Sequence, residues 1–189
     1  DAIRTLLSKS AESAVVIDEA YIDFGGESAV QLIGEYDNLL VVQTLSKSRA
    51  LAGLRVGFAM GSSILIEALG RVKNSFNSYP LDVLAQRAAL ASIEDEDYFR
   101  ISCQRLIKSR DELCFAMAAL GFTVLPSGAN FILASHAQYS ARELFARLRE
   151  RGIVVRYFDK PRIDNHLRIS IGTEVDNAAL VDALRELLA

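Results

Sequence analysis

Short apolar runs separated by polar turns dominate the first 80 residues. Runs at residues 15–17, 39–43 and 55–60 have the length and the branched side chains of strands. A short helical lead-in from residue 1 and a helical stretch near residues 28–34 are expected between them. Because the strands are almost continuously apolar, they predict a sheet covered on both faces. We therefore expect residues 1–80 to have a mostly parallel α/β layout.

The pattern changes after residue 80. Alanines and leucines recur at spacings of three and four over residues 81–120, which predicts helices with a break at the acidic residues 94–97. Beyond them, strands are expected at residues 123–125, 130–134, 154–157 and 167–171, and helices at 141–151 and 174–188, with Gly152 as a carboxyl cap. We expect connecting helices over residues 81–120 and a small α+β domain over 121–189.

Composition restricts the class of protein. The chain is 51% hydrophobic with a formal net charge of −3, so it can bury a core and offers no basic field for nucleic acid. No apolar run approaches the roughly 18 residues of a membrane helix, and no signal-peptide pattern opens the chain. A cytoplasmic location is therefore expected.

Cysteine and histidine usage adds two expectations. Cys103 and Cys114 lie eleven residues apart in a predicted helix, which separates them by roughly 16 Å, too far for a disulfide. We expect both to be reduced packing residues. His136 and His166 are isolated in predicted loops without partners at ligand spacing, so no metal site is expected.

Lys47 is the most informative residue for chemistry. It follows the apolar run at residues 39–43, stands between the hydroxyls of Ser46 and Ser48, and precedes Arg55 by eight positions. A lysine at the end of a buried strand can hold pyridoxal phosphate as a Schiff base and later move a proton. The planar guanidinium of Arg55 suits the cofactor phosphate, as do nearby hydroxyls. Thr44 offers a further hydroxyl.

A carboxylate and a phenol end the first predicted strand. Asp18 can keep a pyridine nitrogen protonated, so that a cofactor ring can accept the electrons of a broken Cα–H bond. Tyr21, three residues further on, can reach the ring oxygen. A hydrogen bond there would lower the pKa of the nitrogen that joins the cofactor to the lysine. Taken alone, Asp18 also fits a helix cap, and Tyr21 also fits a packing aromatic.

Two arginines in the last third are candidates for an anion site. Arg168 alternates with apolar residues on the predicted strand at residues 167–171, where a charge is costly unless it is paired. Arg156, on the predicted strand at residues 154–157, is a second candidate for the same anion.

Four segments carry a resemblance to a known family. They are VVIDEAYIDF from residue 15, TLSKS from residue 44, LAGLRVGFA from residue 51 and LRISIGT from residue 167. In this order and spacing they resemble histidinol-phosphate aminotransferases, a match that covers essentially the whole chain. The resemblance implies a fold-type-I aminotransferase that uses pyridoxal phosphate, a phosphorylated amine and a 2-oxo acid, and forms a homodimer in histidine biosynthesis.

The resemblance also assigns roles. Asp18, Tyr21, Ser46, Lys47 and Arg55 fall on the family's cofactor positions, and Arg168 on the position that meets the substrate phosphate. Members of the family are about twice this length, so the chain is expected to be a carboxy-terminal fragment. Because the missing half supplies part of the site, we expect the chain alone to be inactive.

Three alternatives remain open at this stage. Threonine-phosphate decarboxylase resembles the same family and shares its cofactor apparatus. The chain could instead act only as a folding or dimerisation unit. An apolar strand ending in Asp18-Glu19 also resembles the Walker B element of nucleotide hydrolases, but no glycine lies in the five residues before Lys47, as a Walker A loop requires.

Overall fold

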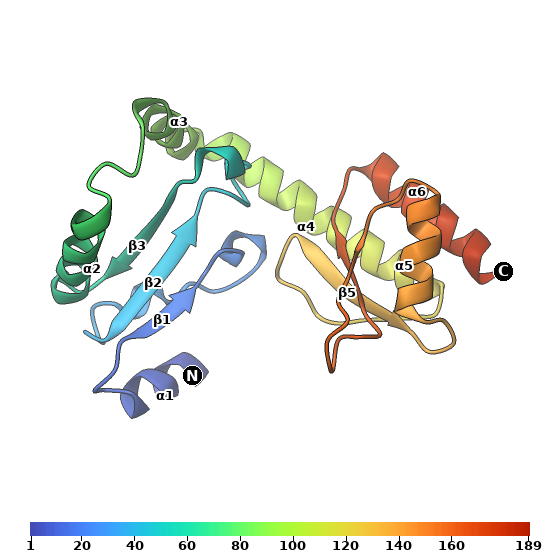
Figure 1. Cartoon of the computed structure of the whole chain (residues 1–189), viewed down its shortest axis with the longest axis horizontal. Coiled ribbons are helices and arrows are strands. Elements are labelled where there is room, and N and C mark those ends of the chain that lie inside the picture. Colours follow the sequence, from blue (N-terminus) through green and yellow to red (C-terminus); the bar gives the residue numbers. More distant parts are fainter. The chain divides into compact units, whose positions relative to one another are not determined.

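The computed structural model describes residues 1–189 and divides into two compact units, residues 1–101 and 102–189 (Figure 1). Each unit has its own sheet and its own buried core. The predicted domain boundaries at residues 80 and 120 stay a prediction. None of the helices is long and apolar enough to cross a membrane.

Unit 1 alternates helical and extended segments, as the sequence predicted. Its strands are β1 (Val15–Asp18), β2 (Leu39–Thr44) and β3 (Gly57–Gly61), and its short 3-10 turns are η1 (Ile22–Phe24), η2 (Ala29–Leu32) and η3 (Ala52–Leu54). Its helices are α1 (Ala2–Lys9), α2 (Ser63–Phe76), α3 (Val83–Glu94) and the start of α4 (Glu96–Ala119). The predicted break in the acidic stretch is confirmed at Asp95, between α3 and α4.

The first sheet has the order β1-β2-β3. β1 and β2 run parallel, as expected, whereas β3 joins β2 in the antiparallel direction. A parallel connection needs a long crossover, usually a helix, and only short turns lie between β2 and β3. The strand predicted from residue 55 begins at Gly57, because Arg55 has a left-handed backbone with φ +56°.

Buried side chains from α1, η2 and the first two strands form the core of unit 1. Leu7, Leu39 and Val41 are almost completely buried there, with Val15, Ala29 and Leu32 around them. β2 therefore contributes a continuous apolar run to the core, as its sequence indicates. A second, smaller cluster packs Leu45 and Val56 against Ala85 and Ala89 of α3.

Helix α2 was not predicted from the sequence. None of its residues is buried, and Ile64, Val72 and Phe76 are among its exposed apolar side chains. The helix therefore has no buried apolar face within this chain.

Unit 2 is an α+β unit, and its strands are β4 (Phe122–Val124), β5 (Phe131–His136), β6 (Arg156–Tyr157) and β7 (Leu167–Ser170). They pair antiparallel throughout in the order β4-β5-β7-β6. Most of α4, α5 (Ala141–Glu150) and α6 (Glu174–Leu188) complete the unit. The predicted final helix is confirmed at both ends, while the strand expected from residue 154 is only two residues long.

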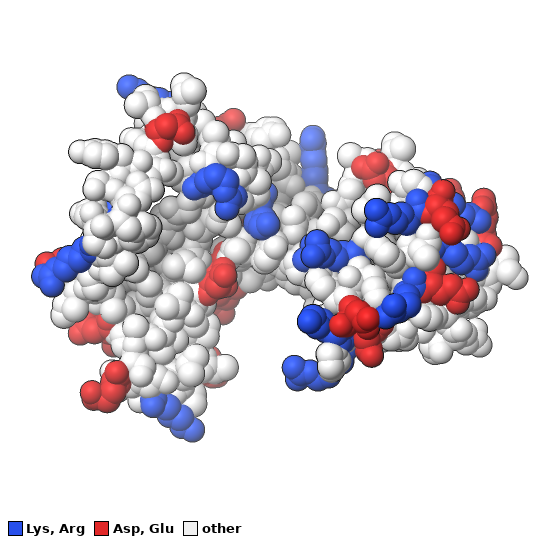
Figure 2. Space-filling model, viewed as in Figure 1, with Lys and Arg blue, Asp and Glu red and all other residues white.

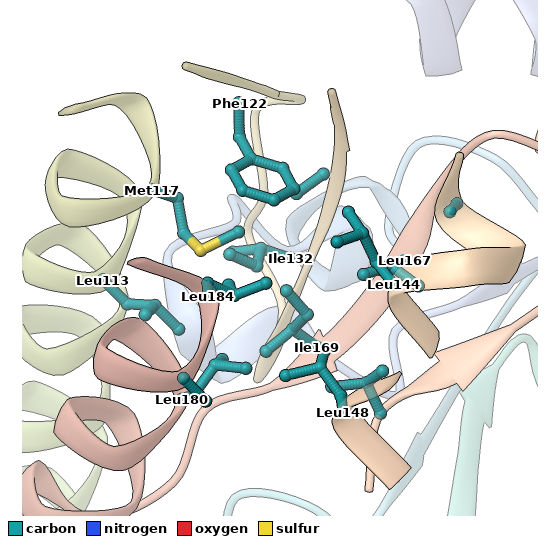
Figure 3. Close-up of a cluster of buried hydrophobic side chains, with 14 of the residues drawn as sticks. Leu113, Met117, Phe122, Ile132, Leu144, Leu148, Leu167, Ile169, Leu180 and Leu184 are labelled. Carbon is teal, nitrogen blue, oxygen red and sulfur yellow. The ribbon is translucent and has the colours of Figure 1, made fainter. Parts of the chain in front are cut away.

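One face of the second sheet supplies the main core of the protein (Figure 3). Ile132 and Ala134 of β5 and Leu167 and Ile169 of β7 alternate along their strands and are buried. They pack with side chains of α4, α5 and α6, among them Met117, Leu148, Leu180 and Leu184. The intervening residues of the strands, including Arg168, therefore lie on the opposite face of the sheet.

Local signals mark where two helices of unit 2 begin and end. Gly152 has φ +78° just after α5, which confirms the predicted carboxyl cap. Thr173 and Asp176 form a capping box at the start of α6. The hydrogen bonds from Thr173 hold the pKa of Asp176 below its usual range.

The cysteines are free, as predicted, and Cys103 is buried. His136 corrects a sequence prediction, because it ends β5 instead of lying in a loop and is 9% exposed. Its ring packs edge-on between Phe122 and Tyr139, with both centroid distances at 5.0 Å. Its Nε2 lies 3.2 Å from the Leu120 carbonyl, so His136 is a packed and hydrogen-bonded core residue.

Replacing Leu184 with alanine should destabilise unit 2 by about 2–5 kcal/mol, because a fully buried side chain leaves a cavity. V175A on the same helix removes an exposed side chain and should cost roughly 0.5 kcal/mol or less. Urea unfolding followed by circular dichroism measures both. Equal losses in the two variants would contradict the assigned core.

The capping box should add stability that depends on pH. Because the pKa of Asp176 is lowered in the folded state, its contribution is present above the unfolded pKa of about 3.9 and is lost as pH falls through the folded value. The stability difference between the wild type and D176N should therefore shrink below about pH 4. E174Q, in the same turn but outside the box, is the control. If the stability difference between the wild type and D176N stayed constant down to acid pH, the Asp176 carboxylate would not contribute in this way.

Candidate active site

The parallel pairing of β1 and β2 creates the candidate site of unit 1. Asp18, the last residue of β1, pairs with Val42, and β2 ends two residues later at Thr44. Because the strands run in the same direction, their carboxyl ends meet at one edge of the sheet. The segments that follow, which contain Tyr21 and Lys47, therefore emerge from the same edge.

Two side-chain contacts join these segments. The Lys47 ammonium lies 5.5 Å from the centre of the Tyr21 ring, a cation–π distance. The neighbouring Ser48 hydroxyl donates a hydrogen bond to the Asp23 carboxylate. Lys47 is exposed and takes part in no ion pair, so no carboxylate fixes its amine.

Asp18 is exposed at the end of β1. Its Oδ1 accepts the backbone N–H of Ala20 at 3.0 Å, which fixes the carboxyl group near the strand end. No arginine or lysine forms an ion pair with it. The carboxylate therefore keeps acceptor capacity for a further donor.

The turn after β2 carries the predicted phosphate donors. The Thr44 hydroxyl lies 2.9 Å from the Ser46 hydroxyl and 3.3 Å from the Val56 carbonyl, and it accepts the Ser46 backbone N–H at 3.1 Å. Thr44 thus closes the turn, while the Ser46 hydroxyl retains donor capacity.

Arg55 follows at the far end of this turn. Its Nη1 donates to the Ala52 carbonyl at 3.0 Å, which leaves most of its N–H groups available. Ala50 and Arg55 both have φ +56°, a left-handed backbone that is costly for residues other than glycine. Such strain often gathers at functional turns.

Two residues of this edge were not recognised from the sequence. Glu19 is 6% exposed and accepts three hydrogen bonds, from Ser28, Ala29 and Gln43. Arg49 lies 3.9 Å from the centre of the Phe99 ring, and it donates to the Ser92 carbonyl. The sequence signal for Glu19 is a second carboxylate at the strand end, but its burial depends on the fold of a ten-residue loop.

Unit 2 brings Arg156 and Arg168 together. They pair directly across β6 and β7, so their side chains leave the same face of the sheet. The Arg168 guanidinium lies 5.1 Å from the centre of the Phe131 ring and 5.7 Å from that of Phe158, and Arg156 lies 5.3 Å from that of Phe158. The sequence prediction missed both aromatic residues. Phe158 lies two residues after Arg156, and Phe131 lies two residues before Leu133, which pairs with Arg168.

Neither arginine is neutralised. No ion pair involves Arg156 or Arg168, and the buried Nε of Arg168 has no hydrogen-bond partner. Like charges directly opposite on a sheet repel each other, and an unpaired buried donor costs free energy. An anion bound between the two guanidinium groups would remove both costs. On the face in Figure 2, both signs of charge are intermingled over the unit that contains β5, α5 and α6.

His166 lies two residues before Arg168 and just before β7. Its buried Nδ1 also lacks a hydrogen-bond partner. A hollow of about 760 Å³ in unit 2 lies elsewhere, along α4 and the start of α6, and is lined by residues such as Arg105, Ser109 and Thr173. It contains none of the predicted site residues.

Comparison with known proteins gives a consistent result. The family model for aminotransferase class I and II matches residues 1–184. Histidinol-phosphate aminotransferase 1 of Hydrogenovibrio crunogenus is 58% identical over 187 residues, which cover 99% of this chain and 52% of the relative. The chain therefore spans about half the length of the curated relatives it matches.

Two solved structures share the fold. The histidinol-phosphate aminotransferase of Clostridium acetobutylicum has a TM-score of 0.88 at 26% identity, covering 99% of this chain and 57% of that one. The enzyme of Sinorhizobium meliloti, solved in complex with pyridoxal-5'-phosphate, has a TM-score of 0.84 at 24% identity, covering 94% and 49%. These likenesses confirm the predicted fold class.

A family model that covers nearly the whole chain, together with these neighbours, also confirms the resemblance seen in the sequence motifs. The chain belongs to the aminotransferase class I and II family.

Proposed function

We propose that this chain forms the carboxy-terminal half of a pyridoxal-phosphate-dependent aminotransferase that acts on histidinol phosphate and 2-oxoglutarate. The observation that carries the proposal is the edge formed by parallel β1 and β2, where Lys47 lies against Tyr21 beside the strand that ends in Asp18. The 58% identical relative is a histidinol-phosphate aminotransferase, which supports the same substrate.

The residues at this edge fit the cofactor by their chemistry. The Asp18 carboxylate has acceptor capacity for a protonated ring nitrogen, and the Tyr21 phenol is a donor for a ring oxygen. The Ser46 hydroxyl and the Arg55 guanidinium are donors suited to a phosphate. Lys47, without a carboxylate partner, can hold the cofactor through its amine.

Each residue then has a defined role. Pyridoxal phosphate, when bound, supplies a sink for the electrons of the substrate Cα–H bond. Asp18 holds the proton on the ring nitrogen, which maintains that sink. The Lys47 amine would accept the proton from the substrate Cα and later donate it. Tyr21 would donate a hydrogen bond to the ring oxygen, which would lower the pKa of the nitrogen that joins the cofactor to Lys47.

Arg156 and Arg168 would bind the substrate anion. Their cross-strand pairing without a carboxylate supports a phosphate ligand, because two planar guanidinium groups can each donate two hydrogen bonds. We assign the larger share to Arg168, whose Nε is buried.

We further propose that the complete enzyme is a cytoplasmic homodimer of histidine biosynthesis. The exposed apolar side chains near α2 and α3 support a surface covered by further protein. Phe76, Tyr79 and Leu84 are 79%, 94% and 79% exposed in this chain. Such surfaces are rarely left open to water.

Borohydride reduction of the full-length enzyme loaded with pyridoxal phosphate should place the label on Lys47, because only this lysine follows β2 at the candidate edge. Peptide mapping distinguishes it from the other four lysines of the chain. K47R should lose the label, and K73R, a change at an exposed lysine of α2, should keep it. A label on another lysine would contradict the assignment of Lys47 as the residue that holds the cofactor.

R168A in the full-length enzyme should raise KM for histidinol phosphate roughly 10- to 100-fold, the loss expected for charged hydrogen bonds. The affinity for the cofactor should change little, and R156A should have the same effect to a smaller degree. R149A removes an exposed arginine of α5 and is the control. An unchanged KM in R168A would leave Arg168 a structural role only.

A further inference from the structure

Glu19 is a buried carboxylate that the proposed mechanism does not use. Its side chain is 6% exposed and has no arginine or lysine partner. Its Oε2 accepts hydrogen bonds from the Ser28 hydroxyl at 2.8 Å and the Gln43 amide at 2.9 Å, and its Oε1 accepts the Ala29 backbone N–H at 2.6 Å. A charge is kept in a buried position only where several donors satisfy it.

These three donors lie on two different parts of the chain. Ser28 and Ala29 lie at the far end of the loop that begins at Glu19, so the carboxylate closes that loop at its base. Gln43 lies on β2, one residue before the strand ends at Thr44 and the turn to Lys47 begins. Glu19 therefore joins the loop after β1 to the strand that precedes the lysine.

The closed loop carries the groups that meet the lysine segment. Within it, Tyr21 lies under the Lys47 ammonium and Asp23 accepts a hydrogen bond from Ser48. Asp18, immediately before Glu19, is fixed by the Ala20 N–H at the same strand end. A displacement at Glu19 would move the loop relative to β2, and with it Tyr21 relative to Lys47.

We infer that Glu19 is a positioning residue, whose hydrogen bonds to Gln43, Ser28 and Ala29 hold Asp18 and Tyr21 in register with Lys47. The inference rests on the proposed function, since it concerns the cofactor end of that site. Glu27 lies in the same loop and accepts a hydrogen bond from Gln31, but it is exposed and forms no hydrogen bond with β2. It therefore offers a matched carboxylate without the positioning contacts.

The test uses the full-length enzyme with pyridoxal phosphate and follows the visible absorbance of the bound cofactor as a function of pH. E19Q leaves a single acceptor oxygen for the three donors Ser28, Ala29 and Gln43, so it weakens the link to β2. With Tyr21 displaced, the midpoint of the titration should move to higher pH, and kcat should fall roughly 10- to 100-fold, the scale of a misplaced catalytic group. KM for histidinol phosphate should change far less, because the proposed anion site is elsewhere in the chain.

Two further variants separate positioning from stability. E19Q/Q43E exchanges the two functional groups, so the new amide can donate to the new carboxylate, and it should restore most of the wild-type midpoint and kcat. E27Q should behave as the wild type. If E19Q does not fold, Q43A keeps the donors of Ser28 and Ala29 and should show a smaller upward shift of the midpoint.

The outcomes distinguish this inference from the proposed function. A wild-type midpoint in a folded E19Q, with only a lower melting temperature, would overturn the positioning role, and so would an equal shift in E27Q or a failure of the exchange to restore the midpoint. A wild-type enzyme that gains no visible absorbance with pyridoxal phosphate would overturn the proposed function and this inference together.

Discussion

The structure of the candidate site depends on one constraint, the parallel register of β1 and β2. Pairing of Asp18 with Val42 makes the two strands end at one edge of the sheet. The candidate site residues of unit 1 lie at this edge or in the segments that follow it. A shift by one residue would turn the apolar side chains of the strand to the opposite face and move Asp18 with them. The buried side chains of Leu39 and Val41 oppose such a shift, because they fix β2 in the core.

Polar contacts then fix the positions of the segments that follow the two strands. Glu19 links the loop after β1 to β2, and Arg49 links the segment after Lys47 to the junction of α3 and α4. Lys47 itself stays free of carboxylates, which leaves its amine available. In unit 2, Arg156 and Arg168 also lack a carboxylate partner, and they pair directly across two strands. The arginine pair costs stability in the absence of a ligand, and both arrangements suit groups that bind one.

The sequence predicted most elements because hydrophobic periodicity and capping residues act locally. The capping box of Thr173 and Asp176 and the αL backbone of Gly152 are examples, and the helices they bound were predicted to within one residue. Features that depend on distant pairing were missed. The exposed helix α2 has no buried residue in this chain, and the antiparallel direction of β3 depends on the short connection after β2, which apolar periodicity alone does not report.

The same distinction applies to the candidate site. Lys47, Asp18, Tyr21, Ser46 and Arg55 were named from motif and strand position, and the fold brings Tyr21 and Lys47 into contact. The burial of Glu19 and the packing of Phe131 and Phe158 beside Arg168 were not foreseen, since each depends on loop closure or strand register. His136 was misjudged for the same reason, because its aromatic neighbours come from β4 and the loop after β5.

The central claim is that the edge shared by β1 and β2 holds the cofactor, with Asp18 at its ring nitrogen. The most direct measurement is the ¹⁵N chemical shift of ring-labelled pyridoxal phosphate bound to the full-length enzyme, compared with D18N. A protonated ring nitrogen in the wild type that loses its proton in D18N is the result this account predicts. A ring nitrogen whose shift is the same in both proteins would contradict it.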